Sequence, residues 1–313
     1  MSAMIEIRNL VKHFGPLIAV DDISFQVERG EVLGFLGPNG AGKSTTMKLV
    51  TGYLSPTSGD IWVCGHKVSE EPIKAKEKIG YLPEGAPAYP DMTPASYLRF
   101  IADIRGLGGE HRKARLAEVV ERIGLDSVWH QPIDTLSKGY RRRVGLAQAI
   151  LHDPEVLILD EPTDGLDPNQ KHEVRSLISE MARNKAIVIS THILEEVEAV
   201  CSRAIIIANG RIVADGTPAE LQARSRYHNA VVLTISDANG DAVAGELGRV
   251  EGVARVEADG DGRFVLFPVD GAAIVDAVSA RTRERGWRVS GLYVDSGRLD
   301  EVFRSITTGG GAQ

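Results

Sequence analysis

Residues 37–44 read Gly-Pro-Asn-Gly-Ala-Gly-Lys-Ser and fit the pattern G-x-x-x-x-G-K-[ST] of a phosphate-binding loop. The loop follows a short apolar stretch, Glu31–Leu36, and opens a helical pattern over Ser44–Thr51. Its glycines allow the backbone to turn N–H groups toward phosphate oxygens, and the following helix adds the partial positive charge of its N-terminus. This context of strand, loop and helix argues against a glycine-rich turn with an incidental lysine.

Two side chains at the end of the loop carry charge and metal-binding capacity. Lys43 can place its ammonium on the β- and γ-phosphates of a nucleotide, and the Ser44 hydroxyl can ligate Mg²⁺. The residues that we expect to contact the nucleotide here are Asn39, Gly40, Ala41, Gly42, Lys43, Ser44 and Thr45.

A second motif is an apolar run that ends in two carboxylates. Val156–Leu159 is followed directly by Asp160 and Glu161. Asp160 is expected to bind Mg²⁺ through its water shell, and Glu161 can polarise the attacking water as the catalytic base. A pair of solvated acids at a strand end is common, but its combination with the phosphate loop favours a nucleotide hydrolase.

The N-terminal part alternates strand and helix patterns, which is typical of an α/β domain with a buried parallel sheet. Besides Glu31–Leu36, the predicted strands are Val156–Leu159, Ala186–Ser190 and Ala204–Ile207. Further predicted helices are Pro94–Gly106, Ala114–Gly124, Lys138–His152 and Gln170–Arg183. We expect this domain to cover residues 1–224 and to contain a helical insert at about 85–150.

The composition changes near Gln222, and Ala223–Asn229 has no clear pattern, so we interpret it as a linker. The following stretch predicts β-α-β-β-α-β, the order of a ferredoxin-like α+β domain, over residues 228–308. Its expected elements are Val231–Ile235, Asp241–Leu247, Val253–Ala258, Arg263–Phe267, Gly271–Arg285 and Trp287–Val294, with a further helix at Leu299–Ser305. Residues 309–313 are expected to form a flexible tail.

The net charge of −7 excludes a broad basic field for nucleic acid, so we expect no nucleic-acid partner. The local run Arg141–Arg143 is interpreted as the solvated face of a helix. Cys64 and Cys201 are expected to be reduced thiols of a cytosolic protein. Neither a membrane-spanning run nor a signal peptide is recognisable, so any membrane role requires a partner.

Four further segments narrow the choice among nucleotide hydrolases. Leu136-Ser137-Lys138-Gly139-Tyr140 resembles the LSGGQ signature of the ABC ATPase family, and Thr163-Asp164-Gly165-Leu166-Asp167 resembles the loop that crosses the dimer interface of that family. His192 follows a predicted strand and resembles the family's switch histidine. Phe14 resembles the aromatic residue that stacks on adenine. The resemblance to ABC ATPases covers roughly residues 4–222.

The resemblance implies the roles of these residues. Ser137 and Gly139 would bind the γ-phosphate of an ATP held by a second cassette, His192 would contact the γ-phosphate as a catalytic residue, and two cassettes would form a head-to-tail dimer, most simply a homodimer. Three positions depart from the family pattern: Lys138 replaces a glycine and Tyr140 a glutamine of the signature, and Glu84 stands where a glutamine usually contacts the Mg²⁺ shell. A carboxylate of nearly equal length can reach the same ion, so Glu84 is a candidate metal ligand.

Segments Tyr89–Thr93, Tyr97–Phe100 and Leu299–Phe303 resemble the exporter subgroup of the family, which moves drugs, lipids or polysaccharides, and also gliding-motility and copper-site-assembly ATPases. This implies a motor subunit that works on a separate integral membrane permease, with the chain in the cytoplasm at the inner face of the membrane. The permease chooses the substrate, so the substrate cannot be read from this chain.

Two other functions remain open. The chain could be an importer ATPase whose C-terminal domain senses a small molecule, since ferredoxin-like domains host many functions. It could also be an ATP-gated scaffold with negligible hydrolysis, although Glu161 argues against that reading.

Overall fold

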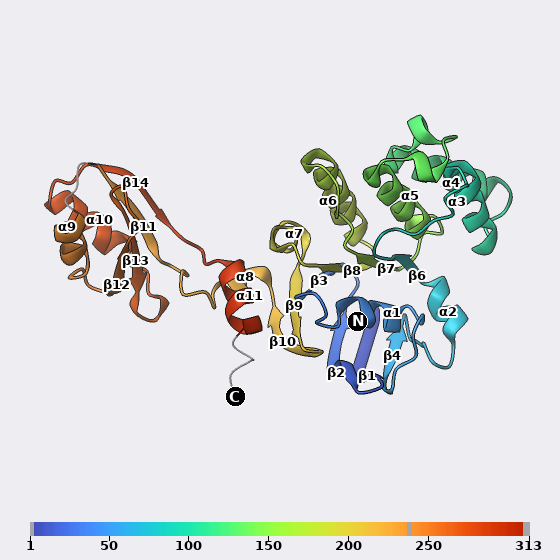
Figure 1. Cartoon of the computed structure of the whole chain (residues 1–313), viewed down its shortest axis with the longest axis horizontal. Coiled ribbons are helices and arrows are strands. Elements are labelled where there is room, and N and C mark those ends of the chain that lie inside the picture. Colours follow the sequence, from blue (N-terminus) through green and yellow to red (C-terminus); the bar gives the residue numbers. More distant parts are fainter. Residues whose placement is uncertain (1–2, 237–239, 309–313) are drawn as a thin grey trace. The chain divides into compact units, whose positions relative to one another are not determined.

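The computed structural model describes residues 3–236 and 240–308, and its contacts divide the chain into two units, Met1–Thr217 and Pro218–Gln313 (Figure 1). The division lies before the domain end at residue 224 that the sequence suggested. The reason is the short helix α8 (Pro218–Gln222), which packs on α11 (Leu299–Thr308) and therefore belongs to the second unit. The predicted tail at 309–313 lies outside the described residues.

A six-stranded sheet forms the centre of the first unit, in the order β10-β9-β3-β8-β7-β6. All neighbouring pairs are parallel except the antiparallel edge pair β9 and β10. The strands are β3 (Val32–Leu36), β6 (Ile79–Leu82), β7 (Val156–Asp160), β8 (Ala186–Thr191), β9 (Arg203–Ala208) and β10 (Arg211–Gly216). Every residue of β3, β7 and β8 is buried, which explains why these strands are continuous apolar runs in the sequence.

A second, antiparallel sheet of four strands has the order β2-β1-β4-β5 and was not predicted from the sequence. Its strands are β1 (Ile5–Phe14), β2 (Leu17–Val27), β4 (Ser58–Val63) and β5 (His66–Lys67). Helix α1 (Lys43–Val50) contacts strands of both sheets, and a single apolar core joins the two sheets and α1. The phosphate loop is therefore anchored at the start of a helix that is packed between two sheets.

The remaining helices of the first unit include the predicted insert. They are α2 (Pro72–Glu77), α3 (Pro94–Ile104), α4 (Gly109–Ile123), α5 (Lys138–Ile150), α6 (Pro168–Ala182) and α7 (Leu194–Val200). Helices α3, α4 and α5 contact one another, and α5 also packs on β6 (green in Figure 1). Thr93 begins α3 with a capping box, and Gly124, with a φ of 69°, ends α4. Within the described residues, no helix is long and apolar enough to cross a membrane.

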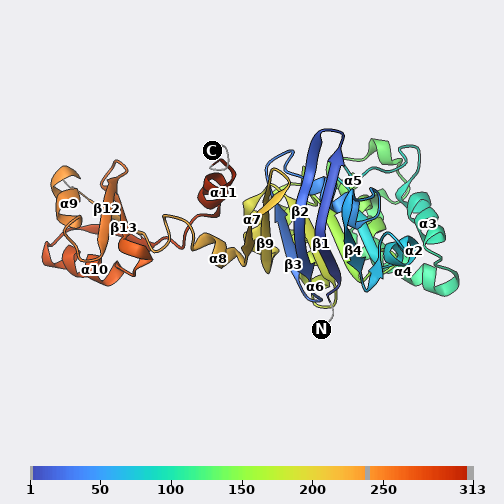
Figure 2. The ribbon, with the colours of Figure 1, turned by 90° about the horizontal axis from the view of Figure 1, so that it is seen from below.

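The second unit has the predicted ferredoxin-like topology, with an antiparallel sheet in the order β12-β13-β11-β14 (Figure 1). Figure 2 shows strands β12 and β13 with the two helices of this fold, α9 and α10. Its elements are β11 (Val231–Ile235), α9 (Gly240–Leu247), β12 (Val253–Ala258), β13 (Arg263–Pro268), α10 (Val275–Glu284) and β14 (Val289–Val294). Helix α10 begins later than the predicted Gly271, because Asp270 and Gly271 have φ angles of 48° and 69° and form a turn after β13.

Candidate functional site

The first unit gathers its chemically active residues at one edge of the parallel sheet. Leu36 pairs with Thr191, and Asp160 pairs with Ser190, so the ends of β3, β7 and β8 lie side by side. The phosphate loop, the acidic pair and His192 each follow one of these strand ends. Parallel α/β sheets bind ligands at this carboxyl edge, so the topology assembles the residues that the sequence motifs singled out.

The loop backbone requires glycine at specific positions. A Cβ atom on Gly42 would lie 2.4 Å from the carbonyl oxygen of Ala19, and one on Gly37 would lie 2.5 Å from the carbonyl oxygen of Ile207. Gly42 also has a φ of 109° and directly precedes the first residue of α1. The helix N-terminus is thereby packed tightly against neighbouring strands, where its N–H groups can meet an anion.

Lys43 is a buried ammonium that faces carboxylates. Its Nζ donates to the carbonyl oxygens of Gly37 at 2.7 Å and Pro38 at 3.2 Å. Burial lowers the pKa of Lys43, whereas the nearby charges of Glu161, Asp160 and Glu84 act in the opposite direction. The carboxylates therefore help to keep Lys43 charged, as binding of phosphate requires.

A pocket of about 410 Å³ lies over the loop, within the size range of small-molecule sites. The predicted residues that line it are Phe14, Asn39, Gly40, Gly42, Lys43, Ser44, Thr45, Glu84 and Glu161. Ala41 is buried in the loop and does not line this pocket. Phe14 is 44% exposed, and the Lys12 ammonium lies 5.0 Å from its ring centre. The structure thus brings most of the predicted binding residues to one cavity.

Asp160 and Glu161 differ in their surroundings. Asp160 is 1% exposed, and within the described residues neither of its carboxylate oxygens has a hydrogen-bond partner. Glu161 Oε1 lies 2.8 Å from Nδ1 of His192, while its buried Oε2 has no partner among the same residues. The backbone of Glu161 has a φ of 52°, and its N–H donates to Ser190 at 2.8 Å.

The unpartnered carboxylate oxygens of Asp160 and Glu161 indicate whether a cation would fit the site. A buried carboxylate without a partner is costly unless a positive charge compensates it, so the acidic pair suits Mg²⁺. Groups of three His, Cys, Asp or Glu that could hold a metal alone do not occur in the described ranges.

The signature segment does not share the pocket of Lys43. Ser137 caps α5 by accepting a hydrogen bond from the Tyr140 N–H at 3.3 Å, and Gly139 is packed so closely that a Cβ would lie 2.7 Å from Gln170. Neither Ser137 nor Gly139 lines the nucleotide pocket. Lys138, which replaces a signature glycine, has its Nζ 2.8 Å from Asp164, so its charge is paired within the subunit.

Arg142 was missed by the sequence analysis, which placed the run Arg141–Arg143 on a solvated face. Arg142 is 3% exposed and lies 3.7 Å from Asp164, and its Nη1 is 3.5 Å from the carbonyl oxygen of Pro83. Burial lowers its pKa, and the charges of Asp164, Glu161, Asp160 and Glu84 oppose that shift. The helical spacing could have shown this, since Gly139 and Leu146, three before and four after it, are also buried.

A groove of about 680 Å³ in the same unit was not predicted either. Its lining is partly apolar and includes Tyr53, Ile73 and Ile104, which are 74%, 67% and 63% exposed. Its other lining residues come from α2, β6, α3 and α5 and from the segments that follow α1, α3 and α5, and include Tyr81, Arg105 and His152.

Comparisons with known proteins agree with these motifs. Residues 20–164 match the family model described as ABC transporter. The chain is 39% identical over 237 residues to the linearmycin resistance ATP-binding protein LnrL of Bacillus subtilis, covering 75% of this chain and 76% of that protein. It is 39% identical over 217 residues to the Nod factor export ATP-binding protein I of Burkholderia orbicola, covering 69% of this chain and 71% of that protein.

A solved structure of an ATP-binding subunit of an ABC transporter superposes with a TM-score of 0.66 at 31% identity, covering 71% of this chain and 92% of that one. Together, these likenesses confirm the predicted family, the α/β fold class and the ATPase activity. The chain belongs to the family of ABC transporter ATP-binding proteins and is the ATP-hydrolysing subunit of a transporter.

Proposed function

We propose that the chain is the motor of an ABC exporter, in which two cassettes bind Mg²⁺–ATP between them and act on a separate membrane permease at the inner face of the membrane. One observation supports a dimer of cassettes: the signature residues Ser137 and Gly139 do not line the pocket that contains Lys43. A second cassette, facing the first head to tail, supplies them to the bound γ-phosphate. The names of LnrL and of the Nod factor protein, which refer to resistance and export, favour export as the direction.

The residues predicted from the sequence motifs have distinct roles in binding ATP. Phe14 stacks on the adenine ring, and the backbone N–H groups of the loop hold the phosphates. Lys43 neutralises charge on the β- and γ-phosphates. Ser44, Asp160 and Glu84 are the residues that would hold Mg²⁺, which supplies neutralisation of the phosphate charge when bound.

Hydrolysis requires a base that is free to accept a proton. His192 engages Oε1 of Glu161 at 2.8 Å and leaves the buried Oε2 without a partner among the described residues. Oε2 can therefore take a proton from water as its oxygen attacks the γ-phosphorus. The bond from that phosphorus to the bridging oxygen breaks, and ADP and phosphate are released.

Mixing two inactive variants tests the shared site. Lys43→Ala removes the phosphate contact of one half-site, and Ser137→Ala removes the signature hydroxyl of the other. Each variant alone is expected to lose ATP hydrolysis, whereas co-expression of differently tagged variants restores part of it, because a mixed dimer contains one intact pair of halves. Ser179→Ala, on the exposed face of α6, is the matched control and should hydrolyse ATP normally. Normal hydrolysis by Ser137→Ala alone would exclude the shared site.

The exposed apolar groove around Tyr53, Ile73 and Ile104 is the surface that we assign to the permease, because apolar patches of this kind mark interaction sites. Ile104→Glu is expected to leave ATP hydrolysis by the isolated chain unchanged and to abolish co-purification with the permease. Val213→Glu, an apolar-to-acid change on exposed β10, is the control and should not affect either measurement. Retained co-purification of Ile104→Glu would place the contact elsewhere.

A further inference from the structure

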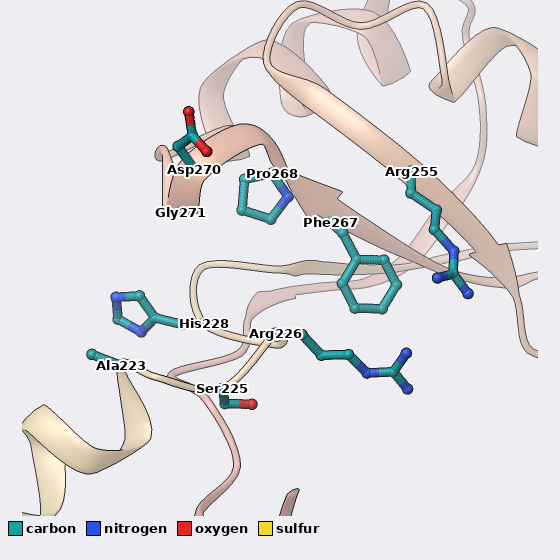
Figure 3. A pocket seen from close by; sticks show the side chains of 9 residues that line it. All are labelled: Ala223, Ser225, Arg226, His228, Arg255, Phe267, Pro268, Asp270 and Gly271. Atoms are coloured by element: carbon teal, nitrogen blue, oxygen red, sulfur yellow. The ribbon is translucent and has the colours of Figure 1, made fainter. Parts of the chain in front are cut away.

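The second unit contains a pocket that no motif of the ATPase explains. It has a volume of about 570 Å³ and is lined by residues of the segment after α8, by strands β12 and β13 and by the turn after β13 (Figure 3). In Figure 3 the side chains of Arg226 and Arg255 lie on one side of the Phe267 ring, and His228 and Asp270 lie on the other.

The floor of the pocket is a small apolar cluster. Phe267 is packed with Val232 and Val265 on one side of the sheet, and this cluster is separate from the core that packs under helices α9 and α10. Arg255 is the cross-strand partner of Phe267, and Glu257 is the partner of Val265, so these side chains share one face of the sheet. The aromatic floor is thus flanked by charged groups.

The two arginines are held in a stack with aromatic rings. The guanidinium carbons of Arg226 and Arg255 lie 5.6 Å and 5.7 Å from the centre of the Phe267 ring. Arg226 is also 4.8 Å from the Tyr227 ring, and Arg298 lies 3.7 Å from that ring's centre. Arg226 Nη2 also donates to the Tyr227 hydroxyl at 2.8 Å. These ring contacts and hydrogen bonds restrain the guanidinium groups beside the pocket, where a guanidinium is a suitable partner for an anion.

The arginine pair has more charge than its acidic partner. Arg226 lies 3.8 Å from Oε1 of Glu257, and Arg255 pairs with the same oxygen. One carboxylate therefore serves two guanidiniums, and the side chains of Arg226 and Arg255 are 51% and 62% exposed. A guanidinium has five N–H donors, so the pair retains capacity for a further carboxylate or phosphate oxygen.

The segment that carries Arg226 is ordered by its own hydrogen bonds. From its sequence, Ala223–Asn229 was expected to be a linker. In the structure, the N–H of His228 donates to the carbonyl oxygen of Ser225 at 3.0 Å, and the N–H of Ala230 donates to that of Tyr227 at 2.9 Å. The Asn229 side chain, in the same segment, donates to the carbonyl oxygen of Gly271 on the opposite wall at 2.7 Å. The segment is therefore ordered by local turns and joined to the opposite wall by a hydrogen bond.

We propose that this pocket binds a small organic anion with an apolar body, whose anionic group meets Arg226 and Arg255 and whose body lies beside Pro268 and the 8% of Phe267 that stays exposed. Asp270 on the far side disfavours a second anionic group at that end, so the pocket suits one anionic end and not two. Every residue that lines the pocket belongs to the second unit, so the pocket lies outside the ATPase motifs.

Titration of the full chain with fluorinated probes, observed by ¹⁹F NMR, tests this proposal. 4-Fluorobenzoate is expected to bind, whereas 4-fluorobenzamide, with the same ring but no charge, binds at least about tenfold more weakly, the cost of losing a charge-assisted hydrogen bond. Inorganic phosphate should displace 4-fluorobenzoate only at much higher concentration, because it cannot use the ring. Equal binding of acid and amide, or equal affinity of phosphate, would refute the proposal.

Substitutions of the two arginines test whether 4-fluorobenzoate binds in this pocket. Arg255→Gln and Arg226→Gln should each weaken 4-fluorobenzoate about tenfold, and Arg255→Lys should lose less, because it keeps the charge. Arg249→Gln removes an exposed arginine that does not line the pocket and should bind as the wild type does. Undiminished binding by Arg226→Gln and Arg255→Gln, with unchanged circular dichroism, would show that these arginines only cover the apolar face of the sheet.

Discussion

Glu161 combines three features that single out one of its oxygens for chemistry. Its backbone is held in the left-handed region, its N–H is bonded to Ser190, and His192 occupies Oε1. A non-glycine residue in this region is costly and persists where the surrounding structure fixes it, which is common at active sites. The backbone and one carboxylate oxygen of Glu161 are therefore held by neighbouring residues.

Replacement of Glu161 by glutamine should separate binding from hydrolysis. The amide is nearly the same size and can still bond to His192, so ATP binding is expected to persist. Loss of the base should lower kcat by about 10²–10⁴-fold. The measurement is ATP turnover beside binding of a fluorescent ATP analogue. Turnover near the wild-type rate would move the base to another residue, with His192 the first to examine.

Single residues were predictable where chemistry demands a type at a fixed spacing. The loop residues, Asp160 and Glu161 are of this kind, since phosphate and Mg²⁺ restrict the choice. For Arg142, helical spacing could indicate the buried face of α5 but not the residues that it contacts. Its partners Pro83 and Asp164 lie in other segments, and a run of three arginines looks like a solvated surface until the fold buries its middle member.

Among the elements, continuous apolar strands could be predicted and irregular ones could not. Strands β7 and β8 are apolar along nearly their whole length because both faces are covered. Strands β1 and β2 pair with several shifts of register, which interrupt the alternation of buried and exposed side chains. The alternation persists in Ile23–Val27 of β2 but is interrupted elsewhere in the two strands, and the antiparallel sheet was missed.

His152 follows α5, at the place where this helix packs on β6, and should make the free energy of unfolding depend on pH. Its Nε2 lies 3.1 Å from the carbonyl oxygen of Ile79, and its buried Nδ1 has no partner in the part of the chain that the structure describes. Burial, followed by the charge of Arg105, lowers the pKa of His152 from 6.5 to about 4. A proton added to Nδ1 would have no acceptor.

Because the folded pKa is depressed, the unfolded chain binds the proton first as pH falls below 6.5. Stability is therefore lost between pH 6.5 and about 4, by roughly 3 kcal/mol at most. His152→Gln can keep the bond to Ile79 and cannot titrate, so its urea midpoint should fall less than that of the wild type between pH 7.5 and 5. His130→Gln, at an exposed position, is the control. Parallel pH profiles for wild type and His152→Gln would contradict the assignment.

On the scale of the whole molecule, the two units have separate cores, so we expect each to fold alone. Residues 1–217 should bind ATP, and residues 218–308 should unfold cooperatively when monitored by circular dichroism. A fragment that starts at residue 228 should melt at a lower temperature than one that starts at 218, because it lacks the packing of α8 on α11. A folded fragment 1–217 that fails to bind ATP would show that the nucleotide site needs the second unit.

The sequence indicated two domains because the composition changes and the motifs end near Gln222, but it placed the border a few residues late. Helix α8 is only five residues long, which is too short for periodicity to reveal. Its membership of the second unit depends on a contact with α11 at the other end of that unit, and such long-range packing cannot be read locally.

The position of β3 in its sheet has a consequence for the chain as it leaves the ribosome. Val32 pairs with Ile187 in β8, and Leu33 pairs with Arg203 in β9. The strand before the phosphate loop can therefore pair only after these two strands have been synthesised. At about 5–20 residues per second, synthesis of the intervening chain takes roughly 8–30 s. During that interval Val32–Leu36, whose five residues are all buried in the folded chain, has no sheet to join, so its apolar side chains stay exposed until the later strands are made.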